Sequence, residues 1–248
     1  MIYIRSAEEI ALMREAGRLV AQAHGVAKKL LTPGMRGDII DREVETFIQD
    51  NGGSPAFKGF RGFPSSVCLS LNNEVVHGIP GRSVLKEGDV VSLDIGVEKD
   101  GYFGDSAWTY IVGKDLQKAS QLLAVTNESL MKGIAKAVEG NRLFDISHAV
   151  QSLVEGHGFS VVREMVGHGI GTKMHEEPQI PNYGPPGKGP LIKAGMVFAI
   201  EPMVNQGTHE IMTMKDGWTA VTRDGSLSAH FEHCVAITDG EPQILTLP

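Results

Sequence analysis

The sequence predicts an α/β fold, in one large domain or two small ones, that consists of two similar halves. Helical and strand-like segments alternate in the same order twice along the chain, and 42% of its 248 residues are hydrophobic, enough to form a substantial core. A second observation is an internal match at a spacing of 106 residues. It pairs Gly34, Ile40, Val44, Phe47, Ile48 and Gly52 with Gly140, Ile146, Val150, Leu153, Val154 and Gly158. Two helices that end at glycine would align this well by chance, so this match alone is weak evidence.

The first half begins with two predicted helices. Ser6 and Glu9 have the spacing of a capping box, and apolar residues then recur at helical intervals. The Thr-Pro-Gly segment 32–34 should end this helix. A second helix is expected near 38–51, where it is followed by the glycine pair 52–53.

Strands follow the helices in each half. In the first half they are expected near 67–71 and 89–97, with residues 102–111 as the return arm of a hairpin. In the second half the order begins again with helices near 115–138 and 146–155, followed by further strands. The chain therefore reads as two units of the same kind.

A repeated strand is the stronger part of the internal match. LKEGDVVSLD (85–94) and IKAGMVFAIE (192–201) agree at a spacing of 107 residues in a Lys-x-Gly turn, in the buried strand that follows, and in a final carboxylate. If the halves are related by an approximate two-fold axis, Asp94 and Glu201 face each other across it. A carboxylate buried without a partner is costly, so this position calls for a counter-charge.

Four carboxylates and one histidine share such apolar or glycine-rich surroundings. They are Asp94, Asp105, His168, Glu201 and Glu232. Oxygen ligands with one nitrogen suit Mn, Fe, Co or Zn, and this many negative charges are balanced by two divalent ions that polarise a shared water into a hydroxide. The set predicts a metal-dependent hydrolase, although each residue alone is more often a turn, cap or core residue.

Composition excludes other classes. The formal net charge of −7 and the pI near 5.7 argue against binding to nucleic acid or to an anionic membrane through bulk positive charge. The two cysteines, Cys68 and Cys234, are far apart in the sequence and indicate a reducing compartment. Neither a signal peptide nor a membrane-spanning run is evident, so we expect a cytoplasmic protein.

Four motifs together resemble one known family. DIGVEKDGYFGDSAW, GHGIGTKMHEEPQIPNYG, VFAIEPM and MKDGWTAVTRDGSLSAHFEH, in this order, closely resemble type I methionine aminopeptidase, in its short, bacterial-like form within metallopeptidase family M24. The resemblance implies the pita-bread (creatinase/aminopeptidase) fold, with pseudo-two-fold halves of about 1–112 and 113–248 around a central antiparallel sheet with outer helices. It implies one catalytic domain over 1–248 whose metal ligands are the five residues already collected.

The resemblance also implies roles for further residues. His77 and His175 match family histidines near the scissile bond, and the apolar slot for the methionine side chain matches a set of mostly apolar positions. These are Phe60, Phe63, Cys68, His77, Met174 and Trp218. The family often has tyrosine at the positions of Phe60 and Phe63 and phenylalanine at Met174, and these departures keep the slot apolar. A monovalent cation, Na or K, is implied at backbone oxygens of the segments matching Asn72, Glu74 and Ser228.

The implied reaction is proteolysis that matures new proteins. A metal-bridging hydroxide attacks the first peptide bond, with Glu201 as general base, and releases the initiator methionine when the second residue is small. The implied partners are peptides and nascent polypeptides with N-terminal methionine, with transient ribosome contact and a monomeric state; ligand types do not identify the physiological metal.

Two competing functions remain at this point. Xaa-Pro aminopeptidases and dipeptidases share the fold and the five ligands, but they lack the GHGIGTKMHEEP and MKDGWTA contexts and usually carry an additional N-terminal domain. A non-catalytic peptide-binding module on the same fold would typically have lost metal ligands, and all five are retained here.

Overall fold

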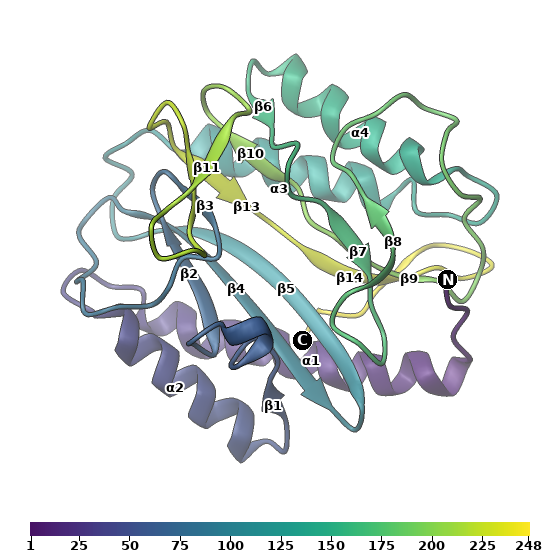
Figure 1. Ribbon diagram of the computed structural model, residues 1–248, viewed down its shortest axis with the longest axis horizontal. Coiled ribbons are helices and arrows are strands. Elements are labelled where there is room, and N and C mark those ends of the chain that lie inside the picture. The colour runs from purple at the N-terminus through teal and green to yellow at the C-terminus, as the bar shows by residue number, and fades with distance from the viewer.

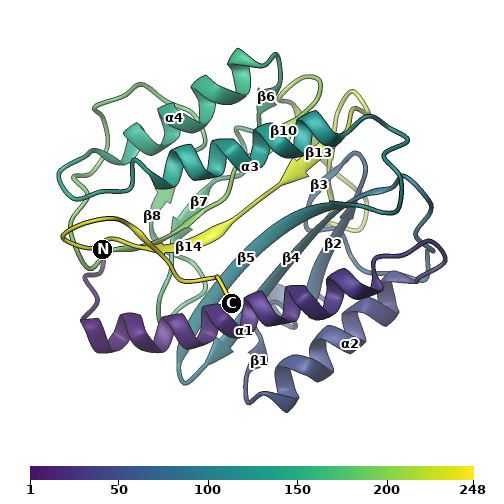
Figure 2. The same ribbon diagram turned by 180° about the vertical axis from the view of Figure 1, so that it is seen from behind.

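The computed structural model describes residues 1–248 as a central layer of antiparallel strands with helices on one face (Figure 1). Seen from behind, α1 and α3 lie across the back of the strands, and α2 and α4 flank them on the outside (Figure 2). The helices are α1 Ala7–Leu30, α2 Gly37–Asp50, α3 Ser120–Ile134 and α4 Leu143–Gly156, with a short 3₁₀ helix, η1, at Phe60–Gly62. None of these helices has the length and apolar character needed to cross a membrane.

The strands form four antiparallel sheets. They are β1 Ser54–Pro55, β2 Val67–Leu71, β3 Glu74–Val76, β4 Val90–Lys99, β5 Tyr102–Ile111, β6 Ser160–Val161, β7 Gly167–Gly169, β8 Glu176–Ile180, β9 Val197–Ile200, β10 Met203–Asn205, β11 Ile211–Thr213, β12 Ala220–Thr222, β13 Ser228–His230, β14 His233–Ala236 and β15 Gln243–Ile244. One sheet has the order β1-β4-β2, with β5 paired to β4, and the largest has the order β15-β14-β9-β7-β8. The other two have the orders β13-β10-β6 and β11-β12-β3.

The predicted start of the first helix is confirmed. The Ser6 hydroxyl accepts a hydrogen bond from the Glu9 amide (3.2 Å), and the Glu9 carboxylate accepts one from the Ser6 amide (2.8 Å). This reciprocal pair satisfies two amides that the first helical turn leaves without partners. The strands predicted at 67–71 and 102–111 are also confirmed, at those residues.

The prediction for the third helix is wrong at both ends. It was expected over 115–138, but α3 begins only at Ser120, because the Asp115 carboxylate accepts hydrogen bonds from the amides of Ala119 (2.8 Å) and Ser120 (2.9 Å). At the other end, the Ala137 amide donates to the Ile134 carbonyl (2.9 Å), a tighter turn that stops the α-helix. A polar cap and a 3₁₀ turn leave little trace in hydrophobic periodicity.

Glycines at matching places in the two halves share one backbone conformation. The φ angle is 90° at Gly34 and 91° at Gly140, and it is 85° at Gly88 and 86° at Gly195. Residues with a side chain rarely adopt this left-handed conformation, so each turn requires glycine. The recurrence of glycine in the sequence therefore reflects the same turns built twice.

The apolar positions of the internal match form two separate cores. In α2 they pack against the first sheet, and in α4 they pack beside α3 and the second sheet. The residues, all with at most 1% of their surface exposed, are Ile40, Val44 and Ile48 in the first core and Ile146, Val150 and Val154 in the second. Each half thus buries most of its helix pair against its own strands, while Met13 of α1 packs with Val197 and Ala236 of the second half.

Hydrogen bonds join the two halves along a central seam, where β5 runs beside the segment from β13 to β14, and β3 of the first half also pairs with β12 of the second. The Glu232 amide donates to the Ala107 carbonyl (2.8 Å), and the Ser106 hydroxyl donates to the Glu232 carbonyl (3.0 Å). The Thr109 hydroxyl donates to the His230 carbonyl (2.8 Å). This seam brings acidic residues from both halves to the centre of the molecule.

Candidate active site

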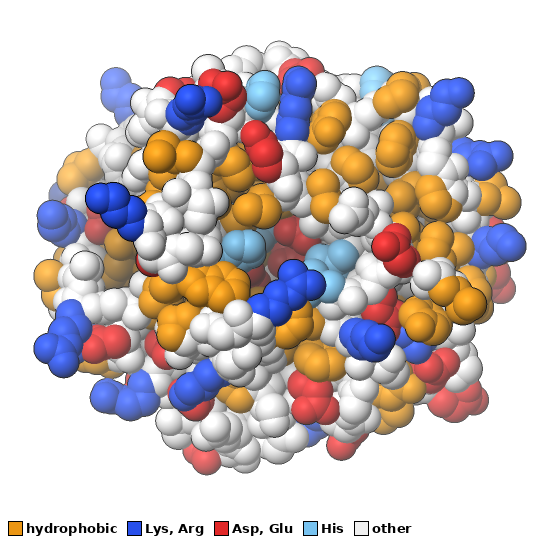
Figure 3. All heavy atoms as spheres, viewed as in Figure 1, with side chains coloured by type: hydrophobic (Ala, Val, Ile, Leu, Met, Phe, Trp, Pro, Cys, Tyr) orange, Lys and Arg blue, Asp and Glu red, His pale blue; other side chains and the backbone are white.

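A cavity of about 160 Å³ opens on the face of the strands opposite the helices. Figure 3 shows histidine and acidic side chains gathered in a hollow near the centre of this face, beside hydrophobic side chains. The lining residues are Phe57, Phe60, Arg61, Phe63, Cys68, His77, Asp94, Asp105, His168, His175, Glu201, Trp218 and Glu232. All five predicted metal ligands therefore line one cavity.

Strand pairing explains why these acids meet. Asp94 lies in the middle of β4 and Asp105 in β5, where their strands pair as arms of one hairpin. Glu201 follows β9 directly, and Glu232 directly precedes β14, which pairs with β9. His168 is the central residue of β7, on the other edge of β9. Each half of the chain thus supplies two acids from one antiparallel pair.

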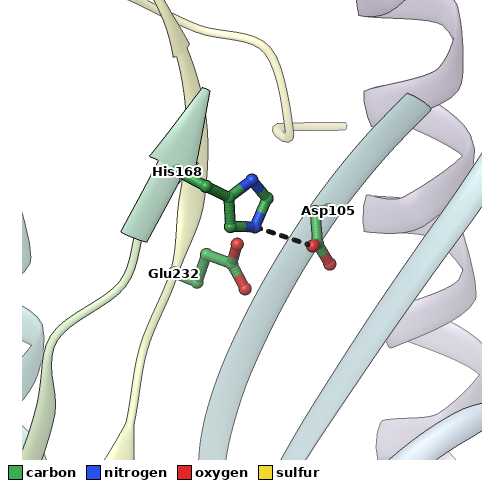
Figure 4. Close-up of side chains that lie close together, drawn as sticks. All are labelled: Asp105, His168 and Glu232. Atoms are coloured by element: carbon green, nitrogen blue, oxygen red, sulfur yellow. Dashed lines mark ion pairs between the residues drawn. The ribbon is translucent and has the colours of Figure 1, made fainter. Parts of the chain in front are cut away.

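The closest group in the cavity consists of Asp105, His168 and Glu232, shown in Figure 4. One potential ligand atom from each of the three lies within 4.8 Å of those of the other two. His168 Nε2 lies 3.8 Å from Asp105 Oδ2 and 3.6 Å from Glu201 Oε1. These separations are longer than hydrogen bonds, so the side chains converge without hydrogen-bonding to one another.

The orientation of His168 suits a metal ligand. Its Nδ1 lies 2.9 Å from the Gly169 carbonyl oxygen, which can only accept a hydrogen bond, so Nδ1 carries the ring proton. The lone pair of Nε2 then faces the carboxylates. A hydrogen bond that fixes the tautomer in this way is usual for metal-binding histidines.

Burial raises the pKa of all four carboxyl groups. It raises the pKa of Asp94 to about 7, because the carboxylate is removed from water. Burial first, and then the charges of the neighbouring acids, raise the pKa of Asp105, Glu201 and Glu232 well above the usual range. The same loss of water lowers the pKa of His168 to about 3, so its ring is neutral.

The site fits divalent metal ions. Buried oxygens of three carboxylates, Asp94 Oδ1, Asp105 Oδ1 and Glu232 Oε1, have no hydrogen-bond partner, which is rare for buried polar atoms. The basic groups within 4 Å of the four carboxylates are His168, beside Asp105 and Glu201, and His230, beside Glu201. Burial lowers the pKa of both histidines to about 3, so neither supplies a positive charge. Carboxylate oxygens with one imidazole nitrogen are a donor set for Mn, Fe, Co or Zn, so these residues can hold a divalent metal.

Two further histidines line the cavity, as the sequence predicted. His77 has a φ of 60°, an unfavourable conformation for a residue with a side chain and one that is common at functional sites. The His175 ring stacks on Phe60 with centroids 5.3 Å apart and lies 4.2 Å from the His168 ring. Burial, with smaller contributions from Arg61 and His77, lowers the pKa of His175 to about 4.

An apolar slot adjoins the carboxylates. Phe57, Phe63, Cys68 and Met174 are buried in one cluster, and Phe60 and Trp218 pack against it. Phe63 and Trp218 meet edge to face with centroids 5.2 Å apart. The main cavity is lined by each predicted slot residue except Met174, which lines an adjoining hollow behind Phe60.

Gly96 gives this slot its depth. A Cβ atom at this position would lie 2.7 Å from Phe57 Cε1 and 2.9 Å from Met174 Cε, closer than real contacts allow. The absence of a side chain therefore lets these two apolar residues pack against β4, two positions from Asp94.

Three residues at the site were not predicted from the sequence. His230 is 2% exposed, and its Nε2 has no hydrogen-bond partner and lies 3.8 Å from Glu201 Oε2. Its place two residues before Glu232 is a usable signal, because alternate residues of a strand share a face. Arg61 and Phe57 line the main cavity, but Arg61 lies in the short helix η1 and Phe57 in the turn before it, a segment without periodic pattern.

The three residues expected at a monovalent cation lie away from this cavity. The Asn72 carbonyl accepts a hydrogen bond from the Ser228 amide (2.9 Å), and the Glu74 carboxylate accepts one from the Leu71 amide (2.8 Å). Asn72 itself has a φ of 57°. The turn thus brings the three segments together.

Comparisons with known proteins agree with this geometry. Residues 11–239 match metallopeptidase family M24. The chain is 54% identical to methionine aminopeptidase 1 of Bacillus subtilis over 246 residues, which cover 99% of both proteins. The crystal structure of methionine aminopeptidase from Thermotoga maritima superimposes with a TM-score of 0.98 at 46% identity and covers 100% of both chains.

A more distant structure supports the fold alone. Prolidase from Pyrococcus furiosus has a TM-score of 0.80 at 22% identity, over 99% of this chain and 65% of that one. These neighbours confirm the predicted pita-bread fold with its antiparallel sheets and outer helices. The matches over the whole chain place it in metallopeptidase family M24 and, within that family, among the methionine aminopeptidases.

Proposed function

We propose that this chain is a metal-dependent aminopeptidase that hydrolyses the first peptide bond of peptides with N-terminal methionine when the second residue is small. One observation carries the proposal: two buried and two half-buried carboxylates and His168 line the same small cavity as an apolar slot. The relatives named methionine aminopeptidase support the same reaction.

The slot and the acids would together recognise the start of a chain. An unbranched thioether fits among Phe60, Phe63 and Trp218, where burial of its apolar surface favours binding. The positively charged α-amine is attracted to the carboxylate-lined end of the cavity near Asp94. A residue without a free amine would place a neutral amide there, so only the first residue is removed.

The chemistry would be divided among three residues. Divalent ions, when bound, supply positive charge that lowers the pKa of water and polarises the substrate carbonyl. Glu201 accepts a proton from the attacking water and later passes one to the leaving amine. His175, a neutral donor, stabilises the negative charge that develops on the carbonyl oxygen, and His77 contacts the substrate beside the scissile bond.

We further propose how the cofactors are bound. Asp94, Asp105, His168, Glu201 and Glu232 would hold two divalent ions, drawn from Co, Mn, Fe or Zn, because one ion would leave the acids undercompensated. Backbone oxygens of the segments at Asn72, Glu74 and Ser228 would hold a sodium or potassium ion. The proposed substrate would be met on nascent chains in the cytoplasm, with transient contact to the ribosome. We also propose that the protein is a monomer.

Peptide hydrolysis tests the proposed function directly. The purified chain, stripped of metal and reloaded with Mn, Co or Fe, is incubated with Met-Ala-Ser, Met-Leu-Ser and an Xaa-Pro peptide, and free amino acids are quantified. We expect metal-dependent release of methionine from Met-Ala-Ser and little from Met-Leu-Ser. Preference for the Xaa-Pro peptide would favour a prolidase-like activity, and the absence of release with every metal would exclude the proposal.

A further inference from the structure

We infer that Arg5 and Glu176 form a clamp that positions His175 for catalysis, an inference that rests on the proposed function. Arg5 Nη2 lies 2.7 Å from Glu176 Oε1 and 2.5 Å from Oε2. The two side chains are 7% and 3% exposed. Arg5 precedes α1, whereas Glu176 immediately follows His175, so the clamp joins the start of the chain to the residue next to a proposed catalytic group.

Glu176 also holds the loop that leads to His175. Its Oε1 accepts hydrogen bonds from the amides of Thr172 (3.0 Å) and Lys173 (3.1 Å) and from the Thr172 hydroxyl (3.3 Å). The carboxylate therefore ties the beginning of the segment 171–175 to its end. This 171–175 loop has the shape of a turn closed by one side chain.

Gly171 shows how closely Arg5 packs on this loop. A Cβ atom at Gly171 would lie 2.2 Å from Arg5 Nη2, so only a glycine admits the guanidinium against the loop backbone. The Gly171 carbonyl also accepts a hydrogen bond from the Phe103 amide in β5 (2.9 Å). The last glycine of the GHGIG motif, Gly171, is thus explained by its contact with the clamp rather than by the cavity.

Arg5 is anchored independently of the loop. Its amide donates to the Gly195 carbonyl (2.7 Å), its Nη1 donates to Glu9 Oε1 in α1 (3.3 Å), and the Tyr3 ring lies 4.8 Å from the guanidinium carbon. The guanidinium thus uses one nitrogen for Glu176 and another for Glu9, and charge-assisted hydrogen bonds of this kind are short and strong. Through this pair the loop takes its position from α1 and from the turn before β9.

The clamp fixes the position of His175 in the cavity. The His175 ring packs against Phe60 and His168. Its backbone directly precedes that of Glu176, the residue that Arg5 holds. Catalytic donors must sit within a fraction of an ångström of their working positions, and a misplacement of about 1 Å costs on the order of a hundredfold in rate. Release of the clamp should therefore slow catalysis without removing any group from the cavity.

The test combines hydrogen exchange with a double-mutant cycle on kcat. Arg5→Met removes the clamp. Arg5→Lys, made in case the first variant folds poorly, retains the charge but has one nitrogen where Arg5 uses two, Nη2 for Glu176 and Nη1 for Glu9. Arg18→Met is the matched control, because Arg18 pairs with Glu15 on the exposed side of α1. Amide exchange of the 171–175 loop is measured by mass spectrometry in metal-free and metal-loaded protein, together with metal content, KM and kcat.

We expect both Arg5 variants to exchange faster in the 171–175 loop and to lose kcat by roughly ten- to a hundredfold, with KM and metal content unchanged. In a His175→Ala background, Arg5→Met should cause no further loss, since the clamp acts through His175. Arg18→Met should match the wild type in every measurement.

Two results would overturn the inference. Unchanged loop exchange in the Arg5 variants would show that the pair does not hold the loop, and an undiminished loss of kcat in the His175→Ala background would show that it does not act through His175. If the wild-type chain releases no methionine, the proposed function fails on that result, and exchange of the loop alone decides whether the clamp holds it.

Discussion

Burial favours the protonated form of the carboxyl groups in the cavity when no metal is bound. Burial raises the pKa of Asp94 to about 7 and raises the pKa values of Asp105, Glu201 and Glu232 well above their usual range. A protonated carboxyl is a poor ligand, so metal binding must displace these protons. His168, with a pKa lowered to about 3, is already neutral and releases none.

Calorimetry at pH 6.5 in two buffers with different ionisation enthalpies measures this displacement. We expect net release of on the order of one or more protons per chain when Mn binds, and an affinity that rises with pH until these carboxyl groups are ionised. Asp105→Asn should release fewer protons and bind the metal more weakly. Binding without proton release at pH 6.5 would contradict the raised pKa values.

Among individual residues, the sequence predicted the acids of the cavity better than the other residues that line or support it. Asp94 and Glu201 were found because a repeated strand ends in a carboxylate twice, and strand order then determines where both acids lie. Arg61 and Phe57 reach the cavity from a segment whose path depends on tertiary packing. The Arg5–Glu176 pair joins residues 171 positions apart, and no local pattern indicates such a contact.

Helix α1 supports the hairpin arm that carries Asp105. A Cβ atom at Gly17 would lie 2.4 Å from the Leu245 carbonyl oxygen, and one at Gly104 would lie 2.8 Å from the Gly17 amide nitrogen. The helix therefore packs on the backbone of β5 and of the segment after β15, with glycine at the contact. Gly25, in the same helix, has no atom within 4 Å of the corresponding position.

This difference predicts opposite effects of one substitution in one helix. Gly25→Ala should stabilise the protein by roughly 0.5–1 kcal/mol, because alanine loses less backbone freedom on folding. Gly17→Ala should destabilise it by about 1–3 kcal/mol, because the helix must shift away from the neighbouring backbone. Urea unfolding of both variants measures the change in free energy, and equal effects of the two substitutions would refute close packing at Gly17.

The sequence predicted the boundaries of helices and strands correctly where a single local motif determines them. The capping box at Ser6 marked the start of α1, and the Lys-x-Gly turns preceded β4 and β9. The ends of α3 depend on the Asp115 carboxylate and a 3₁₀ turn, which hydrophobic periodicity does not reveal. A boundary that depends on one side chain, such as Asp115, is missed when the prediction uses only the pattern of apolar residues.

The proposed metal site lies between the two halves of the whole molecule. Asp94 and Asp105 come from the first sheet, and His168, Glu201 and Glu232 come from the second half. Between them, the seam hydrogen bonds from Ser106 and Thr109 to the opposite half tie the sheets together without metal. We therefore expect the chain to unfold as one domain over residues 1–248, with or without metal.

Thermal unfolding in excess chelator and in excess Mn tests this expectation. One transition should appear in each case, and metal at a hundred times its dissociation constant should add about 2.7 kcal/mol of stability, a rise of roughly 5 to 10 °C in Tm. At one fixed concentration of Mn, the rise should be larger at pH 8 than at pH 5, because the affinity for the metal falls when the carboxyl groups are protonated. The raised pKa of Asp94 favours the metal-free fold below the ordinary carboxyl pKa, and this contribution is lost as pH rises through about 7, where ionised acids bind metal instead. Asp105→Asn from the first half and Glu232→Gln from the second should each diminish the rise. Two separate transitions in chelator would contradict a single domain held together across its site. So would a rise in Tm that is diminished by the substitution in one half and unchanged by the substitution in the other.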